Sequence, residues 1–219
     1  MRTFAIGDVH GEAETLRRLV ESVPIGKDDL LVTLGDYIDR GPDSCEVISY
    51  LINYPGKLEA LKGNHEEMML IARNTREALP IWMANGGGKT LDSYHAASFD
   101  DIPEAHWEFL GRCKDYYDGG DFFCVHAWAN PDKDLKDQDW NTARWCHLDY
   151  WMRANKRLMV CGHTPQLDGH PLFDKEKKIA CIDTGGFRTG WITCLEPETG
   201  HYWQASKTGF REGDLYVDK

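Results

Sequence analysis

The segment Gly35-Asp36-Tyr37-Ile38-Asp39-Arg40-Gly41 directly follows the apolar run Leu30-Leu31-Val32-Thr33-Leu34. An apolar run that ends in glycine is typical of a buried strand that leaves its sheet through a sharp turn. The runs 3–7 and 58–61 end in the same way, the first before Asp8 and the second before Asn64. Asp36 lies 28 residues after Asp8 and 28 residues before Asn64, about the length of one strand–helix unit. We therefore predict parallel strands that bring these three polar side chains to one edge of a sheet.

Helical patterns fill the two intervals between these strands. Behind the first strand, apolar residues recur at the spacing of one helix face, at Leu16, Leu19, Val20 and Val23. Pro42-Asp43-Ser44 is a typical helix start, and the buried face predicted behind it consists of Val47, Ile48, Leu51 and Ile52. The resulting β-α-β-α-β order is typical of parallel strands joined by crossover helices.

The rest of the chain divides into a helical part and a strand-rich part. Residues 66 to about 120 indicate a mainly helical insertion, which begins with a helix after His65. Strands are predicted again at 122–125, 158–161, 179–183, 191–195 and 202–205, and Glu198-Thr199-Gly200 is a hairpin signal between the last two. The predicted fold class is α/β, with a mixed sheet between layers of helices and a late antiparallel portion.

Composition excludes several classes of protein. The chain has 219 residues, 42% of them hydrophobic, which suits one domain with a sizeable core. Its formal net charge of -11 disfavours nucleic acid as a partner. We also expect no membrane partner and a cytoplasmic location, because no apolar run is long enough to span a bilayer and Asp8 comes too early for a secretory signal. Seven scattered cysteines without a C-x-x-C pair indicate reduced, buried thiols.

Five predicted strand ends carry side chains that bind metal ions. Two later ends, Val125-His126-Ala127 and Gly162-His163-Thr164-Pro165, add imidazoles to the three ends already described. The collected candidate ligands are Asp8, His10, Asp36, Asn64, His126 and His163. Oxygen and imidazole ligands without thiolate suit manganese, iron or zinc. Six ligands are too many for one ion with an open position, so we predict two divalent ions that share the Asp36 carboxylate.

The five blocks together resemble the phosphoprotein phosphatase signature of the metallophosphoesterases. They are Gly-Asp-Val-His-Gly at 7–11, Gly-Asp-Tyr-Ile-Asp-Arg-Gly at 35–41, Gly-Asn-His-Glu at 63–66, Val-His-Ala at 125–127 and Gly-His-Thr-Pro at 162–165. Their order and spacing resemble the compact bacterial and phage-lambda-type branch of that family, over about residues 3 to 205. The resemblance implies a β-sandwich of mixed sheets flanked by helices, in one calcineurin-like domain over 1–219 that contains the 66–120 insertion.

The resemblance also implies a role for each candidate residue. Asp8 and His10 would bind the first ion, Asp36 would bridge the two ions, and Asn64, His126 and His163 would complete the ligand shell of the second ion. His65 resembles the general acid that protonates the leaving group, with Asp39 hydrogen-bonded to its imidazole. Arg40 and Asn64 would contact the substrate phosphate. The family usually supplies another arginine, for which Arg144 is the first candidate and Arg153 the second, unless both are solvated or stacked on neighbouring tryptophans.

The implied function is a metal-dependent phosphomonoesterase. Hydroxide between the two ions would attack phosphorus in line, and the substrates would be phosphorylated proteins or peptides carrying phosphoserine or phosphothreonine. Compact relatives also accept phosphotyrosine and small aryl phosphates. A symmetrical dinucleoside tetraphosphate hydrolase shares the metal blocks and remains an alternative. A catalytically idle metal-binding scaffold is the other alternative, although such degeneration usually removes a ligand or the acid.

Other signals do not fit a further site. Gly86-Gly87-Gly88-Lys89-Thr90 imitates a phosphate-binding loop, but Met83 stands where that motif needs glycine, so we interpret the segment as a loop or helix junction. Tyr150 and Trp151 are candidates for a substrate groove. Five histidines match no metal block and are interpreted as surface or structural residues: His95, His106, His147, His170 and His201.

Overall fold

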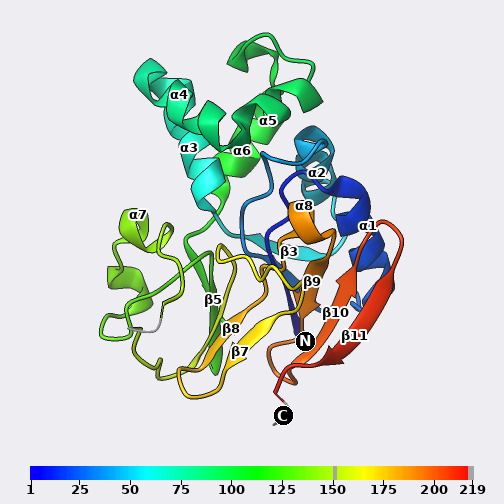
Figure 1. The fold of residues 1–219 in the computed structure, drawn as a ribbon, viewed down its shortest axis with the longest axis vertical. Coiled ribbons are helices and arrows are strands. Elements are labelled where there is room, and N and C mark those ends of the chain that lie inside the picture. The colour runs from blue at the N-terminus through cyan, green and yellow to red at the C-terminus, as the bar shows by residue number, and fades with distance from the viewer. Residues whose placement is uncertain (150–151, 217–219) are drawn as a thin grey trace.

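The computed structural model describes residues 1–149 and 152–216. Tyr150 and Trp151, the candidates for a substrate groove, lie outside the described residues. Two mixed sheets pack against each other, and helices cover them, as Figure 1 shows. The predicted α/β class and the mixed sheets flanked by helices are confirmed.

The first sheet contains the three predicted parallel strands. Its strand order is β11-β10-β9-β1-β2-β3, with β1, β2 and β3 parallel and β9, β10 and β11 antiparallel. The strand bounds are Thr3–Ile6 (β1), Leu30–Thr33 (β2), Lys57–Ala60 (β3), Ile192–Leu195 (β9), His201–Ala205 (β10) and Phe210–Asp214 (β11). The predicted hairpin joins β9 to β10, which pair in register Tyr202 to Leu195. Because β1, β2 and β3 are parallel, their carboxyl ends lie at one edge of this sheet.

The second sheet has the order β4-β5-β6-β8-β7. Its bounds are Tyr116–Asp118 (β4), Phe122–Val125 (β5), Leu158–Cys161 (β6), Leu172–Asp174 (β7) and Ile179–Cys181 (β8). Three strands that the sequence did not predict, β4, β7 and β11, are partly exposed. A strand with one face in water lacks the apolar run that marks a buried strand, which explains why the pattern missed them.

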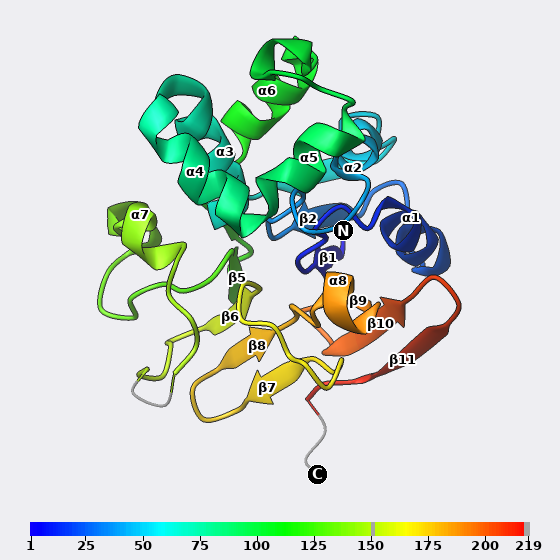
Figure 2. The ribbon, with the colours of Figure 1, turned by 45° about the horizontal axis from the view of Figure 1, so that its top comes forward.

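The helices lie on both sides of this sandwich. Their bounds are Ala13–Ser22 (α1), Ser44–Ile52 (α2), Asn64–Asn74 (α3), Leu79–Trp82 (α4), Gly88–Ser93 (α5), Glu104–Arg112 (α6), Trp140–Ala143 (α7) and Gly186–Thr189 (α8), with single turns at 76–78, 99–101 and 135–137 and a wide turn at 83–87. Figures 1 and 2 both show α3, α4, α5 and α6 gathered at one end of the molecule. No helix among the described residues combines the length and apolarity that a bilayer crossing requires.

Alternation along the central strands divides the core into layers. Phe4 and Ile6 of β1 pack towards the helices, whereas Ala5 packs between the two sheets. The predicted helix faces are buried as expected at Leu16, Leu19, Val47, Ile48 and Leu51. Ile52 was predicted to be buried but is 39% exposed, because it is the last residue of α2 and lies beyond the contact with the sheet. All seven cysteines are free thiols, five of them buried, as predicted.

Candidate metal centre

The predicted ligands converge where the strands end. Asp36, in the turn after β2, lies at the centre of the cluster. Its Oδ2 atom is 3.4 Å from His10 Nε2, and its Oδ1 atom is 3.5 Å from His126 Nε2. Asn64, the first residue of α3, places its Oδ1 atom 3.0 Å from both His126 Nε2 and His163 Nδ1. The predicted convergence of these strand ends therefore exists in the structure.

Backbone conformation at the cluster is unusual. Seven described residues other than glycine have a positive φ, and five of them are predicted site residues: His10, Asp36, Asp39, Arg40 and His163. Such conformations cost about 1–3 kcal/mol each and persist only where the surrounding structure fixes them. Gly162 shows how closely the turns pack, because a Cβ atom there would collide with Asp8 Oδ1. The turns are therefore built for close approach of ligand side chains.

The imidazoles of His10 and His126 are oriented as metal ligands. His10 Nδ1 lies 2.9 Å from the carbonyl oxygen of Ile38, and His126 Nδ1 lies 2.8 Å from that of Leu34. A carbonyl only accepts, so each Nδ1 carries the hydrogen and each Nε2 presents a lone pair within 3.5 Å of the Asp36 carboxylate. In His10 that lone pair accepts a hydrogen from Arg40 Nη1 at 2.9 Å. Burial lowers the pKa of His126, and it lowers that of His10 to about 3, which favours the neutral form of both rings. An imidazole lone pair and a nearby carboxylate oxygen can both bind a cation that lies between them.

Two groups of ligand atoms share Asp36. One group is His10, Asp36 and His65, the other is Asp36, His126 and His163, and within each group the ligand atoms lie within 4.8 Å of one another. This arrangement suits two ions and a common carboxylate. Asp8 belongs to neither group, although its carboxylate accepts the backbone N–H of His163 at 3.1 Å.

A buried carboxyl group beside Asp8 was missed by the sequence analysis. Asp183 follows β8, is buried, and accepts the backbone N–H of Gly185 at 2.9 Å. Burial is the main cause that raises the pKa of Asp183 to about 6, and burial together with the nearby Asp183 carboxylate raises the pKa of Asp8. Asp183 ends a predicted strand and precedes Thr184-Gly185, so the strand-end criterion applied to the other blocks would have found it.

His65 differs from the other imidazoles in its partner. Its Nδ1 atom is 2.7 Å from Asp39 Oδ2, and both side chains are fully buried. Its Nε2 atom has no hydrogen-bond partner and lies 3.9 Å from Asp36 Oδ2. Burial alone would lower the pKa of His65, but the carboxylates of Asp36 and Asp39 outweigh burial and raise that pKa. His65 therefore favours the protonated form, which a general acid needs.

Two residues of the helical region, Trp82 and Thr90, position the Asp39 side chain. Trp82 Nε1–H donates to Asp39 Oδ2 at 2.9 Å, and Thr90 Oγ1–H donates to Asp39 Oδ1 at 2.6 Å. Thr90 ends the glycine-rich segment that imitates a phosphate loop. Gly86 in that segment has φ +109° and passes so close to Arg40 that a Cβ atom would lie 2.8 Å from its backbone nitrogen. The segment thus supports the Asp39–Arg40 turn, a role that no local pattern in the sequence indicates.

Replacing Trp82 by phenylalanine is expected to lower kcat about tenfold, because Asp39 then loses one charge-assisted hydrogen bond and positions His65 less well. Trp107→Phe is the matched control, since Trp107 is also a buried tryptophan of the helical region but its Nε1 has no hydrogen-bond partner. Steady-state turnover and thermal unfolding of both variants check this. Equal losses of kcat in the two variants would contradict a role through Asp39.

Glu66 connects α3 to the turn after β2. Its carboxylate accepts the backbone N–H of Asp36 and of Tyr37, each at 2.8 Å, and that of Gly63 at 2.9 Å. Burial raises the pKa of Glu66 to about 7. The sequence analysis included Glu66 in a block but assigned it no role.

Replacing Glu66 by glutamine is expected to reduce the free energy of unfolding by about 1–3 kcal/mol. The amide NH₂ group of glutamine would face a backbone N–H that the Glu66 carboxylate accepts in the wild type, so that N–H would lose its acceptor. Denaturant unfolding measures this change. Glu77→Gln, on the exposed turn 76–78, is the control and should change the stability by less than about 0.5 kcal/mol. An unchanged midpoint in the Glu66 variant would show that these three bonds do not stabilise the turn.

A pocket of about 560 Å³ opens beside the cluster. Its walls include Asp36, Arg40, Asn64 and His163 from the predicted site, together with Trp145 and Arg188. Arg40 Nη1 lies 2.9 Å from His10 Nε2, next to the metal ligands. His147 is exposed, as predicted for a surface residue, and it also lines this pocket, with its ring 4.4 Å from that of His163.

The two arginines predicted for phosphate binding lie elsewhere in this structure. Arg144 is buried and forms ion pairs with Glu67 and with Asp115, the latter at 2.8 Å. Arg153 is exposed and forms an ion pair with Asp132. Neither belongs to the residues that line the 560 Å³ pocket. A phosphate contact by Arg144 remains a prediction.

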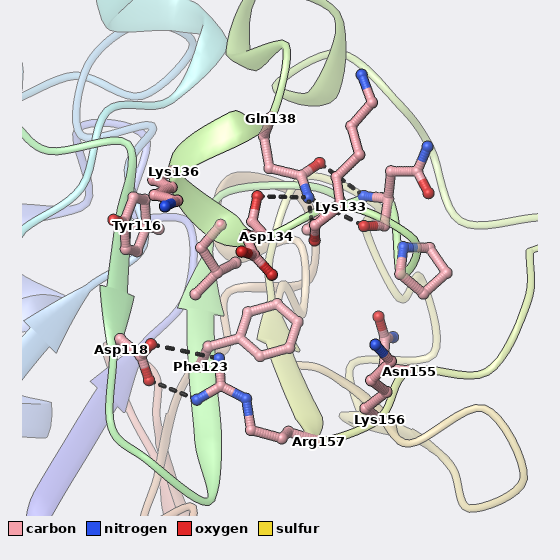
Figure 3. Close-up of a pocket in the computed structure, with 14 residues that line it drawn as sticks. Tyr116, Asp118, Phe123, Lys133, Asp134, Lys136, Gln138, Asn155, Lys156 and Arg157 are labelled. Atoms are coloured by element: carbon pink, nitrogen blue, oxygen red, sulfur yellow. Dashed lines mark hydrogen bonds and ion pairs between the residues drawn. The ribbon is translucent and has the colours of Figure 1, made fainter.

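A separate pocket of about 320 Å³ lies on the outer side of the second sheet (Figure 3). Arg157 in this pocket donates to Asp118, and Gln138 accepts and donates hydrogen bonds within the loop that carries Asn130. None of the described residues that line it is a predicted metal ligand. The chemistry of the predicted site therefore belongs to the pocket beside Asp36.

Comparisons with known proteins agree with this site. The family model for calcineurin-like phosphoesterases matches residues 1–186. Serine/threonine-protein phosphatase 1 of Salmonella typhimurium is 30% identical over 203 residues, covering 87% of this chain and 89% of the relative. The symmetrical bis(5'-nucleosyl)-tetraphosphatase of Pseudomonas fluorescens is 33% identical over 137 residues, covering 62% of this chain and 46% of the relative.

Solved structures share the fold. A putative diadenosine tetraphosphatase superposes with a TM-score of 0.69 at 15% identity, covering 99% of this chain and 95% of its own. A cold-active protein tyrosine phosphatase superposes with a TM-score of 0.68 at 15% identity, and the match covers 100% of this chain and 80% of the phosphatase chain. The five sequence blocks, the ligand cluster and the match over most of the chain lead to one conclusion: this chain belongs to the calcineurin-like phosphoesterase family, whose members are metal-dependent hydrolases.

Proposed function

We propose that this protein is a phosphomonoesterase that removes phosphate from phosphoserine and phosphothreonine in proteins or peptides, and that also accepts phosphotyrosine and small aryl phosphates. The observation that carries the proposal is the pair of ligand groups that share Asp36, with the His65–Asp39 pair directly beside them. The 30% identity to a serine/threonine-protein phosphatase over most of both chains supports the substrate class. We further propose manganese as the ion and the cytoplasm as the location.

The ligand set fits two divalent cations, which would supply positive charge and a water of lowered pKa as nucleophile. Asp8 and His10 would hold one ion, Asn64, His126 and His163 would hold the other, and Asp36 would contribute to both. These carboxylate, amide and imidazole groups are ligands that suit manganese, iron or zinc.

The other residues act on the ester itself. Arg40 binds phosphate oxygens with its planar group of donors, next to His10. His65 gives the proton on Nε2 to the oxygen that leaves phosphorus, since that atom is directed at the cluster without a partner. Asp39 keeps the imidazole oriented and favours its charged form. General acid catalysis of this kind contributes roughly 10²–10⁴-fold to rate.

The test is hydrolysis of p-nitrophenyl phosphate by the metal-free protein, with and without added Mn²⁺, Zn²⁺ or Mg²⁺ and with chelator as the reverse control. We expect turnover at neutral to alkaline pH that depends on the added ion and stops with chelator. Protein that binds metal but does not turn over the ester would instead support the idle scaffold.

A second candidate function is symmetrical hydrolysis of dinucleoside tetraphosphates, favoured by the 33% identity to the Pseudomonas tetraphosphatase. It shares the metal centre, so metal dependence does not separate the two. Side-by-side kcat/KM values for phosphoserine, phosphothreonine and phosphotyrosine peptides and for diadenosine tetraphosphate decide between them. The proposal expects the highest value for a phosphopeptide.

A further inference from the structure

An arginine in the site pocket has no role in the mechanism above. Arg188 lies on α8 and lines the same pocket as Arg40. The guanidinium carbon of Arg188 is 5.2 Å from the ring centroid of Phe187, and that of Arg40 is 5.0 Å from the same centroid. The two guanidinium carbons are therefore at most about 10 Å apart. Among the described residues, no carboxylate forms an ion pair with Arg188, which is exposed.

Arg188 and Arg40 differ in what they contact. Arg40 Nη1 lies 2.9 Å from His10 Nε2, whereas the Arg188 guanidinium lies over the ring of Phe187. That ring packs edge-on against His10, with centroids 5.3 Å apart. The Phe187 ring therefore contacts Arg188, Arg40 and His10, and the exposed guanidinium of Arg188 lines the pocket.

We propose that Arg188 is a specificity-determining residue that binds an acidic side chain of a phosphopeptide, one or two residues from the phosphorylated one. This inference rests on the proposed function. An extended peptide advances about 3.3–3.6 Å per residue, so a carboxylate one or two residues from the phosphorylated one reaches a cation that packs on the same Phe187 ring as Arg40. The planar donors of arginine match a carboxylate in two bonds.

Long-range charge makes this contact useful to the protein. The chain carries a net charge of -11, which repels acidic peptides at a distance. An acidic substrate therefore needs local positive charge in the pocket. Besides Arg40, Arg188 is the arginine or lysine side chain that the described pocket lining provides.

The experiment compares phosphoserine peptides that carry glutamate or glutamine at one position, from two residues before to two residues after the phosphoserine. For the best position, we expect the wild-type kcat/KM for the glutamate peptide to exceed that for the glutamine peptide about three- to tenfold. Arg188→Ala is expected to reduce this ratio to about one, and Arg188→Glu to less than one. Arg112→Ala removes the same charge from an exposed position of α6 outside the pocket and should keep the wild-type ratio.

Each other outcome overturns the inference in a recognisable way. An equal loss on both peptides in Arg188→Ala would place Arg188 on the reacting phosphate. A selective loss of diadenosine tetraphosphate hydrolysis would assign Arg188 to a second phosphate, and a wild-type ratio of one at every position would leave it without a substrate contact. Absence of metal-dependent p-nitrophenyl phosphate turnover in the wild type would instead refute the proposed function itself.

Discussion

Replacing Asp36 by asparagine is expected to lower kcat/KM for p-nitrophenyl phosphate about 10³-fold or more and to reduce bound metal below two equivalents. The Asp36 carboxylate is the group common to both sets of ligand atoms. Its two oxygens face His10 and His126 on different sides, at 3.4 and 3.5 Å. An amide keeps the shape but removes the negative charge and offers one acceptor oxygen, so it cannot bridge two cations in the same way. Several kcal/mol of charge stabilisation correspond to this loss of rate.

Metal analysis after gel filtration, together with turnover, checks this expectation. Asp118→Asn serves as the control, because Asp118 is an exposed carboxylate that pairs with Arg157 in the separate 320 Å³ pocket, which none of the predicted metal ligands lines. Circular dichroism should give the same spectrum for both variants. An Asp36→Asn protein that still retained two ions would exclude Asp36 as the shared ligand, whatever its activity.

The regular spacing of the strand ends made most of this centre predictable. Parallel strands joined by crossover helices must end at one sheet edge, so Asp8, Asp36 and Asn64 could be placed together from the sequence. Apolar runs likewise marked the buried strands, because a strand that is buried in the core consists mainly of apolar residues, which the sequence shows directly. Exposed edge strands such as β11 leave no such record, and they were missed.

The support around the site depends on tertiary contacts and was not predictable in the same way. Trp82 and Thr90 reach Asp39 across 43 and 51 residues of sequence. Glu66 reaches Asp36 across 30 residues, through backbone N–H groups that leave no side-chain signal. Arg144 shows the opposite case, because a position within a plausible motif did not reveal its ion pairs with Glu67 and Asp115.

Replacing His65 by asparagine is expected to lower kcat roughly 10²–10⁴-fold while the protein keeps both ions. Distance alone does not separate an acid from a ligand here, since His65 Nε2 lies in one of the two ligand groups. The hydrogen bonds do separate them. His10 and His126 donate from Nδ1 to backbone carbonyls and have lowered pKa values, whereas His65 pairs with the Asp39 carboxylate and has a raised one.

The leaving group makes this test specific for proton transfer. p-Nitrophenolate leaves readily without a proton, whereas phenolate and the alkoxide of phosphoserine depend on one. The His65→Asn variant should therefore lose more activity on phenyl phosphate than on p-nitrophenyl phosphate, and His126→Asn should lose metal and both activities together. A variant at His65 in which metal content fell in step with rate, with equal losses on both esters, would make His65 a ligand and leave the mechanism without its acid. The raised pKa and the Asp39 contact lead us to expect the first result.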